Sequence, residues 1–205
     1  MALTFSVLDG RQHDRKAFRC GVAALDDYLQ QRASQHQRDG IATTHVLIDY
    51  SEPGRILGYC SLSAAQLHLH ELHASDRKRL PSYPVPAIRV GRLAVASTEQ
   101  GKGYGQLLLG HAVNLALAVQ QNMGVRVLVV DAKDAQAAAF YAGFGFRHTT
   151  DLALTLYLPL GMTAFFKVVV ASTVFSGCLF QQPLFLLPFG VECHRSDGCP
   201  VSCRA

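Results

Sequence analysis

The sequence predicts an α/β protein in which helices flank a central, twisted, mixed β-sheet. Runs of alternating or continuous apolar residues recur at strand length, and between them apolar residues repeat at the spacing of a helix. A cluster of glycines joins one of these strands to the helix after it. With 205 residues, 49% of them hydrophobic and 17% charged, the chain has room for one packed domain and an appendage and is not a disordered protein.

The first third of the chain predicts a strand, a helix and a β-hairpin. Residues 3–8 form the opening strand, and an amphipathic helix over residues 21–37 follows from apolar residues at helical spacing: Val22, Leu25, Leu29 and Ala33. Strands are expected at residues 45–50 and 56–64. The turn-forming run SEPG at residues 51–54 lies between them, so these two strands should be antiparallel neighbours.

The rest of the domain predicts an irregular connection and then regular β/α alternation. Residues 68–86 hold the basic run Arg77-Lys78-Arg79 and prolines at 81, 84 and 86, so no regular element is expected to persist there. Beyond this loop the pattern predicts, in order, a strand at 87–95, a helix at 107–121, a strand at 125–131, a helix at 135–144 and a strand at 152–158.

The strongest chemical signal is the hexapeptide QGKGYG at residues 100–105, between a strand and the helix that it opens. A helix N-terminus presents unpaired N–H groups and the positive end of the helix dipole, and glycines let the backbone approach an anion. The segment therefore predicts a pyrophosphate site, with a flexible glycine turn as the alternative interpretation. Gln106 and Leu107 follow Gly105, which excludes a P-loop, and the mid-chain position excludes a Rossmann loop.

Two segments in register resemble the GNAT superfamily of N-acetyltransferases. The segment GRLAVASTEQGKGYGQLLL (residues 91–109) is similar to the acetyl-CoA signature of that family, and VRVLVVDAKDAQAAAFYAGFGFRHT (residues 125–149) resembles the strand and helix that follow it. Residues 13–48, the strand ILGYCSLS and the segment RKRLPSYPVPAIRVGRLAV are similar to the GNAT toxins of toxin–antitoxin pairs, which acetylate aminoacyl-tRNA. The resemblance spans residues 1–161 and implies one GNAT domain with that family's mixed sheet.

The resemblance implies that acetyl-CoA is the cofactor and assigns residues to it. Its pyrophosphate is expected on the loop, and its pantetheine arm along the edge of the strand before the loop. The cofactor-binding residues are therefore predicted to be Leu93, Ala94, Val95, Gln100, Gly101, Lys102, Gly103, Tyr104 and Gly105. Tyr141 lies where the family places the tyrosine that protonates the leaving sulfur. Without the resemblance, Tyr141 would be interpreted as a core aromatic beside Phe140 and Phe144.

The sequence contains little that could serve as a general base. Residues 88–95 include no Asp, Glu or His, and Glu99, which follows, could act only through water. An α-amine has a reference pKa of about 7.7 to 8.0, against about 10.4 for lysine, so far more of it is already neutral near pH 7. This difference favours an α-amine acceptor.

A formal charge of +4 gives weak support for a polyanionic partner. The residues predicted to bind tRNA are Arg77, Lys78, Arg79, Arg89 and Arg92. The alternative is that these are ordinary solvated charges, with Arg92 supporting the cofactor loop. No metal site is expected at the three histidines His68, His70 and His73, because no cysteine or carboxylate pattern beyond Glu71 accompanies them.

The resemblance also implies partners and a cellular role. It implies a toxin that blocks translation, a DNA-binding antitoxin that restrains it, and a homodimer. Cys20 and Cys60 show no pairing pattern and the N-terminus has no secretory apolar core, which indicates the cytoplasm. Two alternatives stay open: a GNAT enzyme acting on a protein N-terminus, a lysine or a small amine, and a catalytically silent partner of a DNA-binding antitoxin.

Residues 162–205 differ from the rest of the chain and resemble nothing in the family. Residues 168–191 carry no charge, and Cys193, Cys199 and Cys203 follow at irregular spacing. The prolines at 183 and 188 are awkward for a membrane-spanning helix. This composition favours an aberrant, poorly ordered extension, from a lost stop codon or a frame change, over a membrane anchor or a second domain.

Overall fold

Strands of one mixed sheet form the centre of the domain. In the computed structural model, residues 2–78, 80 and 82–160 are described, and the extension predicted at 162–205 lies outside them. The sheet has the order β1-β2-β3-β4-β5-β7-β6. Its strands are β1 (Leu3–Val7), β2 (Thr43–Asp49), β3 (Glu52–Leu67), β4 (Val85–Val95), β5 (Val127–Asp131), β6 (Arg147–His148) and β7 (Thr155–Pro159).

Pairing in the sheet is antiparallel except at its centre. The strands from β1 to β4 pair antiparallel in sequence order, and β5, β7 and β6 pair antiparallel with each other. β4 and β5 are parallel, and their pairing runs only from Ala87↔Val127 to Val90↔Val130. Since β4 continues to Val95, its last five residues have no described strand on the β5 side.

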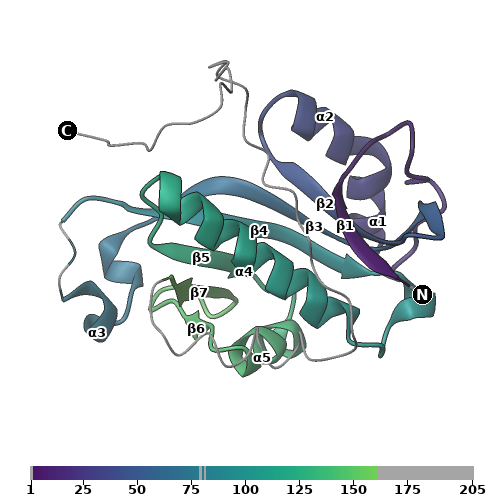
Figure 1. Cartoon of the computed structure of the whole chain (residues 1–205). Coiled ribbons are helices and arrows are strands. Elements are labelled where there is room, and N and C mark those ends of the chain that lie inside the picture. Colours follow the sequence, from purple (N-terminus) through teal and green to yellow (C-terminus); the bar gives the residue numbers. More distant parts are fainter. Residues whose placement is uncertain (1, 79, 81, 161–205) are drawn as a thin grey trace, which may run out of the picture. The chain divides into compact units, whose positions relative to one another are not determined.

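Helices lie on both faces of the sheet. On one face, α4 (Tyr104–Asn122) runs along the strands and α5 (Ala135–Gly143) packs beside it, and together they cover the largest apolar cluster (Figure 1). The opposite face carries α1 (Ala23–Asp27), the π-helix η1 (Tyr28–Arg32) and α2 (Ala33–Arg38) over a second cluster. A third cluster on this face includes residues from the region of the short helices η2 (Leu69–Glu71) and α3 (Ala74–Arg77).

The close approach of α4 to the sheet depends on one glycine of β3. A Cβ built on Gly58 would lie 2.8 Å from Leu108 Cδ1 of α4 and 2.9 Å from the carbonyl oxygen of Ala94 on β4. Both distances are shorter than side chains tolerate, so a glycine is needed where helix and strands meet. This contact positions the start of α4 beside the end of β4.

The predicted fold class and the β-hairpin are confirmed, and three details of the prediction are wrong. Residues 68–86 are not a plain loop, because η2 and α3 form there and β4 already begins at Val85. Asp76 of α3 accepts hydrogen bonds from Tyr157 (2.6 Å) and Arg147 (2.7 Å), which are long-range contacts that local composition does not reveal. Strand β6 was missed, and a π-helix interrupts the predicted helix over residues 21–37.

Candidate active site

The glycine-rich loop between β4 and α4 has the backbone conformation of an anion cradle. Gly101 and Gly103 both have φ +82°, in the left-handed region that other residues rarely adopt. A Cβ on either would meet nothing within 4 Å, so backbone conformation and not crowding favours glycine here. Gly103 is the N-cap of α4, whose first N–H groups and positive dipole end lie at the loop. The open space over both glycines suits a bound diphosphate.

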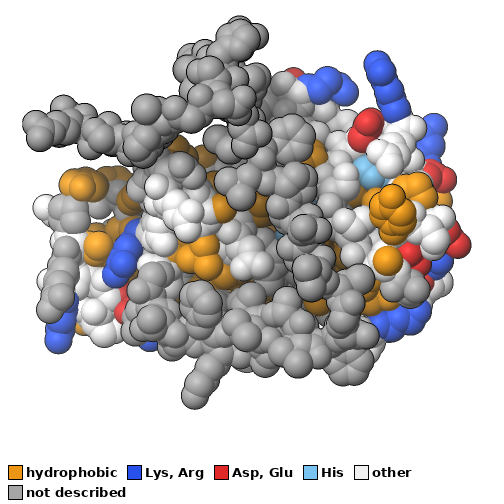
Figure 2. Space-filling view, viewed as in Figure 1, with side chains coloured by type: hydrophobic (Ala, Val, Ile, Leu, Met, Phe, Trp, Pro, Cys, Tyr) orange, Lys and Arg blue, Asp and Glu red, His pale blue; other side chains and the backbone are white. Residues whose placement is uncertain are grey.

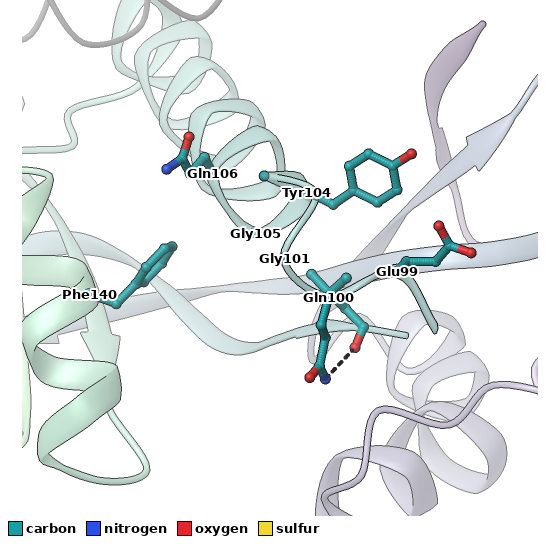
Figure 3. Close-up of a pocket in the computed structure, with 9 residues that line it drawn as sticks. Glu99, Gln100, Gly101, Tyr104, Gly105, Gln106 and Phe140 are labelled. Atoms are coloured by element: carbon teal, nitrogen blue, oxygen red, sulfur yellow. Dashed lines mark hydrogen bonds between the residues drawn. The ribbon is translucent and has the colours of Figure 1, made fainter. Parts of the chain in front are cut away.

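A pocket of about 360 Å³ opens beside this loop. Figure 3 shows Phe140 of α5 on one side of the pocket and the loop on the other. Gln100 Nε2 donates to the carbonyl oxygens of Cys20 (2.9 Å) and Val95 (3.2 Å), which ties the loop to the end of β4 (Figure 3). The lining residues are Val95, Glu99, Gln100, Gly101, Gly103, Tyr104, Gly105, Gln106 and Phe140.

Six of the nine residues predicted to bind the cofactor line the pocket, and three do not. Leu93 and Ala94 lie further back along β4, next to the lining residue Val95. Lys102 does not line the pocket, because its ammonium group donates to Glu99 at 2.8 Å. The prediction missed Phe140, although its position beside Tyr141 on one helix was a usable signal.

Glu99, at the start of this loop, links it to neighbouring residues through ion pairs. Its side chain is only 4% exposed and accepts hydrogen bonds from Lys102 (2.8 Å) and Arg55 (2.5 Å). The hydrogen bond from Lys102, together with the charges of Lys102 and Arg55, lowers the pKa of Glu99. A carboxylate with a lowered pKa and two cationic partners is a poor proton acceptor, which argues against Glu99 as the general base.

The lowered pKa of Glu99 predicts a pH-dependent stability. A carboxyl group whose pKa is lower in the folded protein than in the unfolded chain stabilises the fold above the unfolded pKa. This stabilisation is lost as the pH falls from the unfolded pKa through the folded pKa. The unfolded pKa of a glutamate is about 4.3, so the Glu99→Gln variant should lose less stability than the wild type as the pH falls from about 5 to about 3. Urea unfolding across this range measures the difference, and parallel curves for the two proteins would contradict the ion-pair assignment.

The strands β4 and β5 separate next to the pocket. Their last paired residues are Val90 and Val130, after which β4 continues toward the loop while β5 ends at Asp131. The edge of β4 that includes Leu93 and Val95 is therefore open to an extended ligand, as expected for the pantetheine arm. Val95 lies on this open edge and lines the pocket together with the loop, so the loop, the pocket and the edge form one continuous path for an extended ligand.

Tyr141 reaches the same region from α5. Its side chain is 8% exposed and packs against Phe140 and Phe146. Burial, with smaller contributions from Cys60 and Asp131, raises the pKa of Tyr141 to about 12. Its phenol is thus protonated at neutral pH and available as a proton donor. Tyr141 packs directly against Phe140, which lines the pocket.

Comparison with known proteins agrees with this geometry. The family model described as "Acetyltransferase (GNAT) domain" matches residues 42–148. The chain belongs to the GNAT acetyltransferases.

Proteins similar to this chain include a tRNA-acetylating toxin and two proteins of known structure, AtaT and KacT. A tRNA-acetylating toxin of Mycobacterium tuberculosis is 33% identical over 145 residues, which cover 71% of this chain and 85% of the relative. The structure of AtaT complexed with acetyl-methionyl-tRNAfMet is 28% identical, with a TM-score of 0.72, and covers 77% of this chain and 94% of AtaT. A KacT variant, 24% identical, supports the fold with a TM-score of 0.74 over 83% of this chain and 99% of KacT.

The described basic residues predicted to bind tRNA lie in two places in this GNAT domain, at the end of α3 and on β4. Arg77 and Lys78 are exposed at the end of α3, and Arg79 lies outside the described residues. Arg89 pairs with Asp131, and the guanidinium carbon of Arg92 lies over the ring of Tyr28, 3.7 Å from its centroid. On the face seen in Figure 2, the Lys and Arg side chains that are visible lie apart from each other, mostly toward the margins.

The cysteines and loop histidines have structural contacts. Burial raises the pKa of Cys20 to about 11 and that of Cys60 to about 12, so neither thiol is activated as a nucleophile. His68 and Glu71 form a capping box at η2, and His70 pairs with Asp151 at 3.1 Å. Within the described part of the chain, no three metal-binding side chains are grouped, and no helix is long and apolar enough to cross a membrane.

Proposed function

We propose that this GNAT enzyme uses acetyl-CoA to acetylate the α-amino group of aminoacyl-tRNA and so acts as a toxin that stops translation. The single observation that carries the enzymatic part is the continuous path from the left-handed glycine loop, through the pocket, to the open edge of β4. The acceptor is supported by the tRNA-acetylating toxin that is 33% identical and by the 28% identical AtaT, whose structure contains acetyl-methionyl-tRNAfMet.

The residues of the path fit acetyl-CoA and have separate tasks. The N–H groups of the loop and of the first turn of α4 bind the diphosphate, and the end of β4 orients the extended arm. When bound, the cofactor supplies an acetyl group activated as a thioester. Tyr141 donates its phenolic proton to the departing sulfur, and burial holds that proton in place until transfer.

Aminoacyl-tRNA suits a site in which Glu99, the carboxylate that follows β4, is not free to act as a general base. The carboxylate nearest to the loop, Glu99, is occupied by Lys102 and Arg55. An α-amine, with its reference pKa of about 7.7 to 8.0, is partly neutral at pH 7 and can attack without one, whereas a lysine amine at about 10.4 cannot do so to the same extent. The proposed acceptor is thus the amine that depends least on deprotonation by the protein.

The test is an acceptor panel with isotopically labelled acetyl-CoA. Charged tRNA, uncharged tRNA, a peptide with a free N-terminus, a lysine peptide and a polyamine are each incubated with the protein. Label in charged tRNA, found by mass spectrometry on the α-amine, supports the proposal. Label in another acceptor supports a different GNAT activity, and absence of acetyl-CoA binding in calorimetry supports a catalytically silent module.

Replacing Arg77, Lys78 and Arg79 together with Gln should weaken tRNA binding. Arg77 and Lys78 are exposed and can reach phosphates, and each phosphate contact contributes about 0.9 to the slope of log K against log salt for duplex nucleic acid. The expected result is a slope smaller by about one to three. Binding titrations at several salt concentrations measure this slope. An unaltered slope would remove the three residues from the interface.

The proposed partners follow from the same relatives. We place a DNA-binding antitoxin beside this toxin, because AtaT and KacT structures include the AtaR and KacTA complexes with DNA. The proposed assembly is a homodimer and the proposed compartment is the cytoplasm, where charged tRNA is found. Copurification with the product of the adjacent gene and a mass measurement in solution test the two assemblies.

A further inference from the structure

The sheet face opposite α4 has a polar strip between its two apolar clusters. Along β3, Tyr59 belongs to the cluster under α1 and α2, and Leu67 belongs to the cluster near η2. Every second residue of a strand shares a face, so Ser61 and Ser63 lie between these clusters. Opposite them on β4 are Arg89 and Arg92. This strip has the polar character of a binding surface.

A bulge brings both arginines to the same face. Residues three apart on a regular strand point to opposite faces, and Arg89 and Arg92 are three apart. The register between β3 and β4 shifts by one residue here, because Ser61 pairs with Arg92 while Leu62 pairs with Val90, leaving Gly91 as the extra residue. Arg92 is thereby directed toward η1, where it lies over Tyr28.

Tyr28 is a rigid platform for the guanidinium of Arg92. Its side chain is 2% exposed, and its hydroxyl lies 2.9 Å from Ser61 Oγ. The ring stacks on Tyr59 with the centroids 6.3 Å apart and meets His36 edge-on at 5.5 Å. An arginine on a fixed aromatic ring loses little freedom when it binds an oxygen atom.

The guanidinium of Arg92 has no ion-pair partner among the described residues. Among residues 2–78, 80 and 82–160, no carboxylate forms a salt bridge with Arg92, and its recorded side-chain contact is the Tyr28 ring. The carboxylate on this strip, Asp131, is taken by Arg89 and by Thr155, whose hydroxyl donates at 3.0 Å. The planar fork of N–H donors on Arg92 is thus left for a ligand.

The strip is also where an acceptor can approach. The cofactor loop opens into α4, which covers one face of the sheet together with α5 and Tyr141. An amine must therefore come from the other face, through the gap that opens after Val90 and Val130. Arg92 immediately precedes Leu93 on the open edge of β4, so it borders that gap on the acceptor side.

On the basis of the proposed function, we propose that Arg92, held on Tyr28, binds the carbonyl oxygen of the aminoacyl ester and so selects an α-amine with an adjacent carbonyl. The amine of a lysine side chain has no carbonyl at that distance. The same positive charge disfavours a second cation nearby, so it disfavours the ammonium form of the acceptor and favours the neutral nucleophile. Arg92 thus provides part of what a general base would otherwise supply.

Titratable and charged groups beside Arg92 and its aromatic platform include Tyr59, Asp26, the Arg89–Asp131 pair and His36. Burial raises the pKa of Tyr59 and raises the pKa of Tyr141 to about 12, so both phenols stay neutral. The opposite charges of Arg89 and Asp131 form an ion pair. His36, edge-on to Tyr28, is the group that a control has to remove.

The experiment compares kcat/KM for charged tRNA across pH 6 to 9 in the wild type, Arg92→Gln and Arg92→Lys. Arg92→Gln should lower kcat/KM by about 10- to 100-fold, as expected for a lost hydrogen bond to a charged group. The acid limb of kcat, measured in the same experiment at saturating charged tRNA, reports ionisation in the enzyme–substrate complex. This limb should move to higher pH by about 0.5 to 1 unit, because the bound acceptor amine becomes more basic without the cation. Arg92→Lys should keep the limb in place but lower kcat/KM, since the charge remains and the planar fork is lost.

Three controls make the outcome decisive. Arg11→Gln removes an exposed charge elsewhere and should change neither quantity, and His36→Gln should leave the acid limb where it is. Calorimetry should give wild-type acetyl-CoA affinity for Arg92→Gln, and weakened affinity would reassign Arg92 to the cofactor loop. If the wild type acetylates charged tRNA but Arg92→Gln has the acid limb and the kcat/KM of the wild type, the role of Arg92 is wrong and the proposed function stands. If the wild type labels no charged tRNA, the proposed function fails and the assignment with it.

Discussion

Replacing Tyr141 with Phe should lower the rate of acetyl transfer by about 10²- to 10⁴-fold, the usual contribution of a positioned proton donor. The change removes one hydroxyl from a ring that packs against Phe140 and Phe146, so the apolar contacts and the fold should persist. Because the diphosphate is expected on the glycine loop and not on α5, acetyl-CoA affinity should be unchanged. Expression of this variant should no longer arrest bacterial growth.

Single-turnover acetylation of charged tRNA, with cofactor affinity from calorimetry, checks this result. A second tyrosine provides a matched control, because Tyr50 is 78% exposed and lies at the turn after β2. The Tyr50→Phe variant should retain wild-type rate and toxicity. A Tyr141→Phe enzyme that transfers acetyl at the wild-type rate would show that another group protonates the sulfur.

The parts of the site that sequence predicted are those formed by neighbouring residues. The glycine loop and the helix after it are contiguous, and their chemistry depends on backbone N–H groups and on φ values that glycine alone adopts easily. Tyr141 could be named because it belongs to a segment that resembles the family and is also contiguous. Local pattern was sufficient to locate this loop and the helix that follows it, and the role of Tyr141 stays a prediction.

The acceptor side was not predictable in the same way, because it depends on register and on distant contacts. Arg89 and Arg92 were both predicted to bind tRNA, yet one pairs with Asp131, 42 positions away, and the other lies on Tyr28. The bulge at Gly91 that directs Arg92 cannot be recognised from composition, since it is a relation between two strands. The π-helix that carries Tyr28 was likewise hidden within an ordinary helical repeat.

Replacing Gly101 with Glu should abolish measurable acetyl-CoA binding or weaken it by at least about 30-fold. A carboxylate at this position occupies the open space of the loop and repels the diphosphate in a partly desolvated pocket. The left-handed φ of +82° adds strain, because a residue with a Cβ rarely adopts it. Without bound cofactor, acetylation and growth arrest should both be lost.

Two further variants separate charge from backbone strain and from general damage. Gly101→Asn imposes a Cβ at the same φ without a charge, and asparagine tolerates this conformation better than most residues, so its affinity should fall by less than about fivefold. Gly124→Glu adds a carboxylate at an exposed glycine away from the loop and should bind acetyl-CoA normally. Calorimetry on all three variants, with folding verified by circular dichroism, completes the test. If Gly101→Glu bound acetyl-CoA as the wild type does, the diphosphate would have to lie elsewhere, because a carboxylate and a diphosphate cannot share this cradle without a loss of affinity.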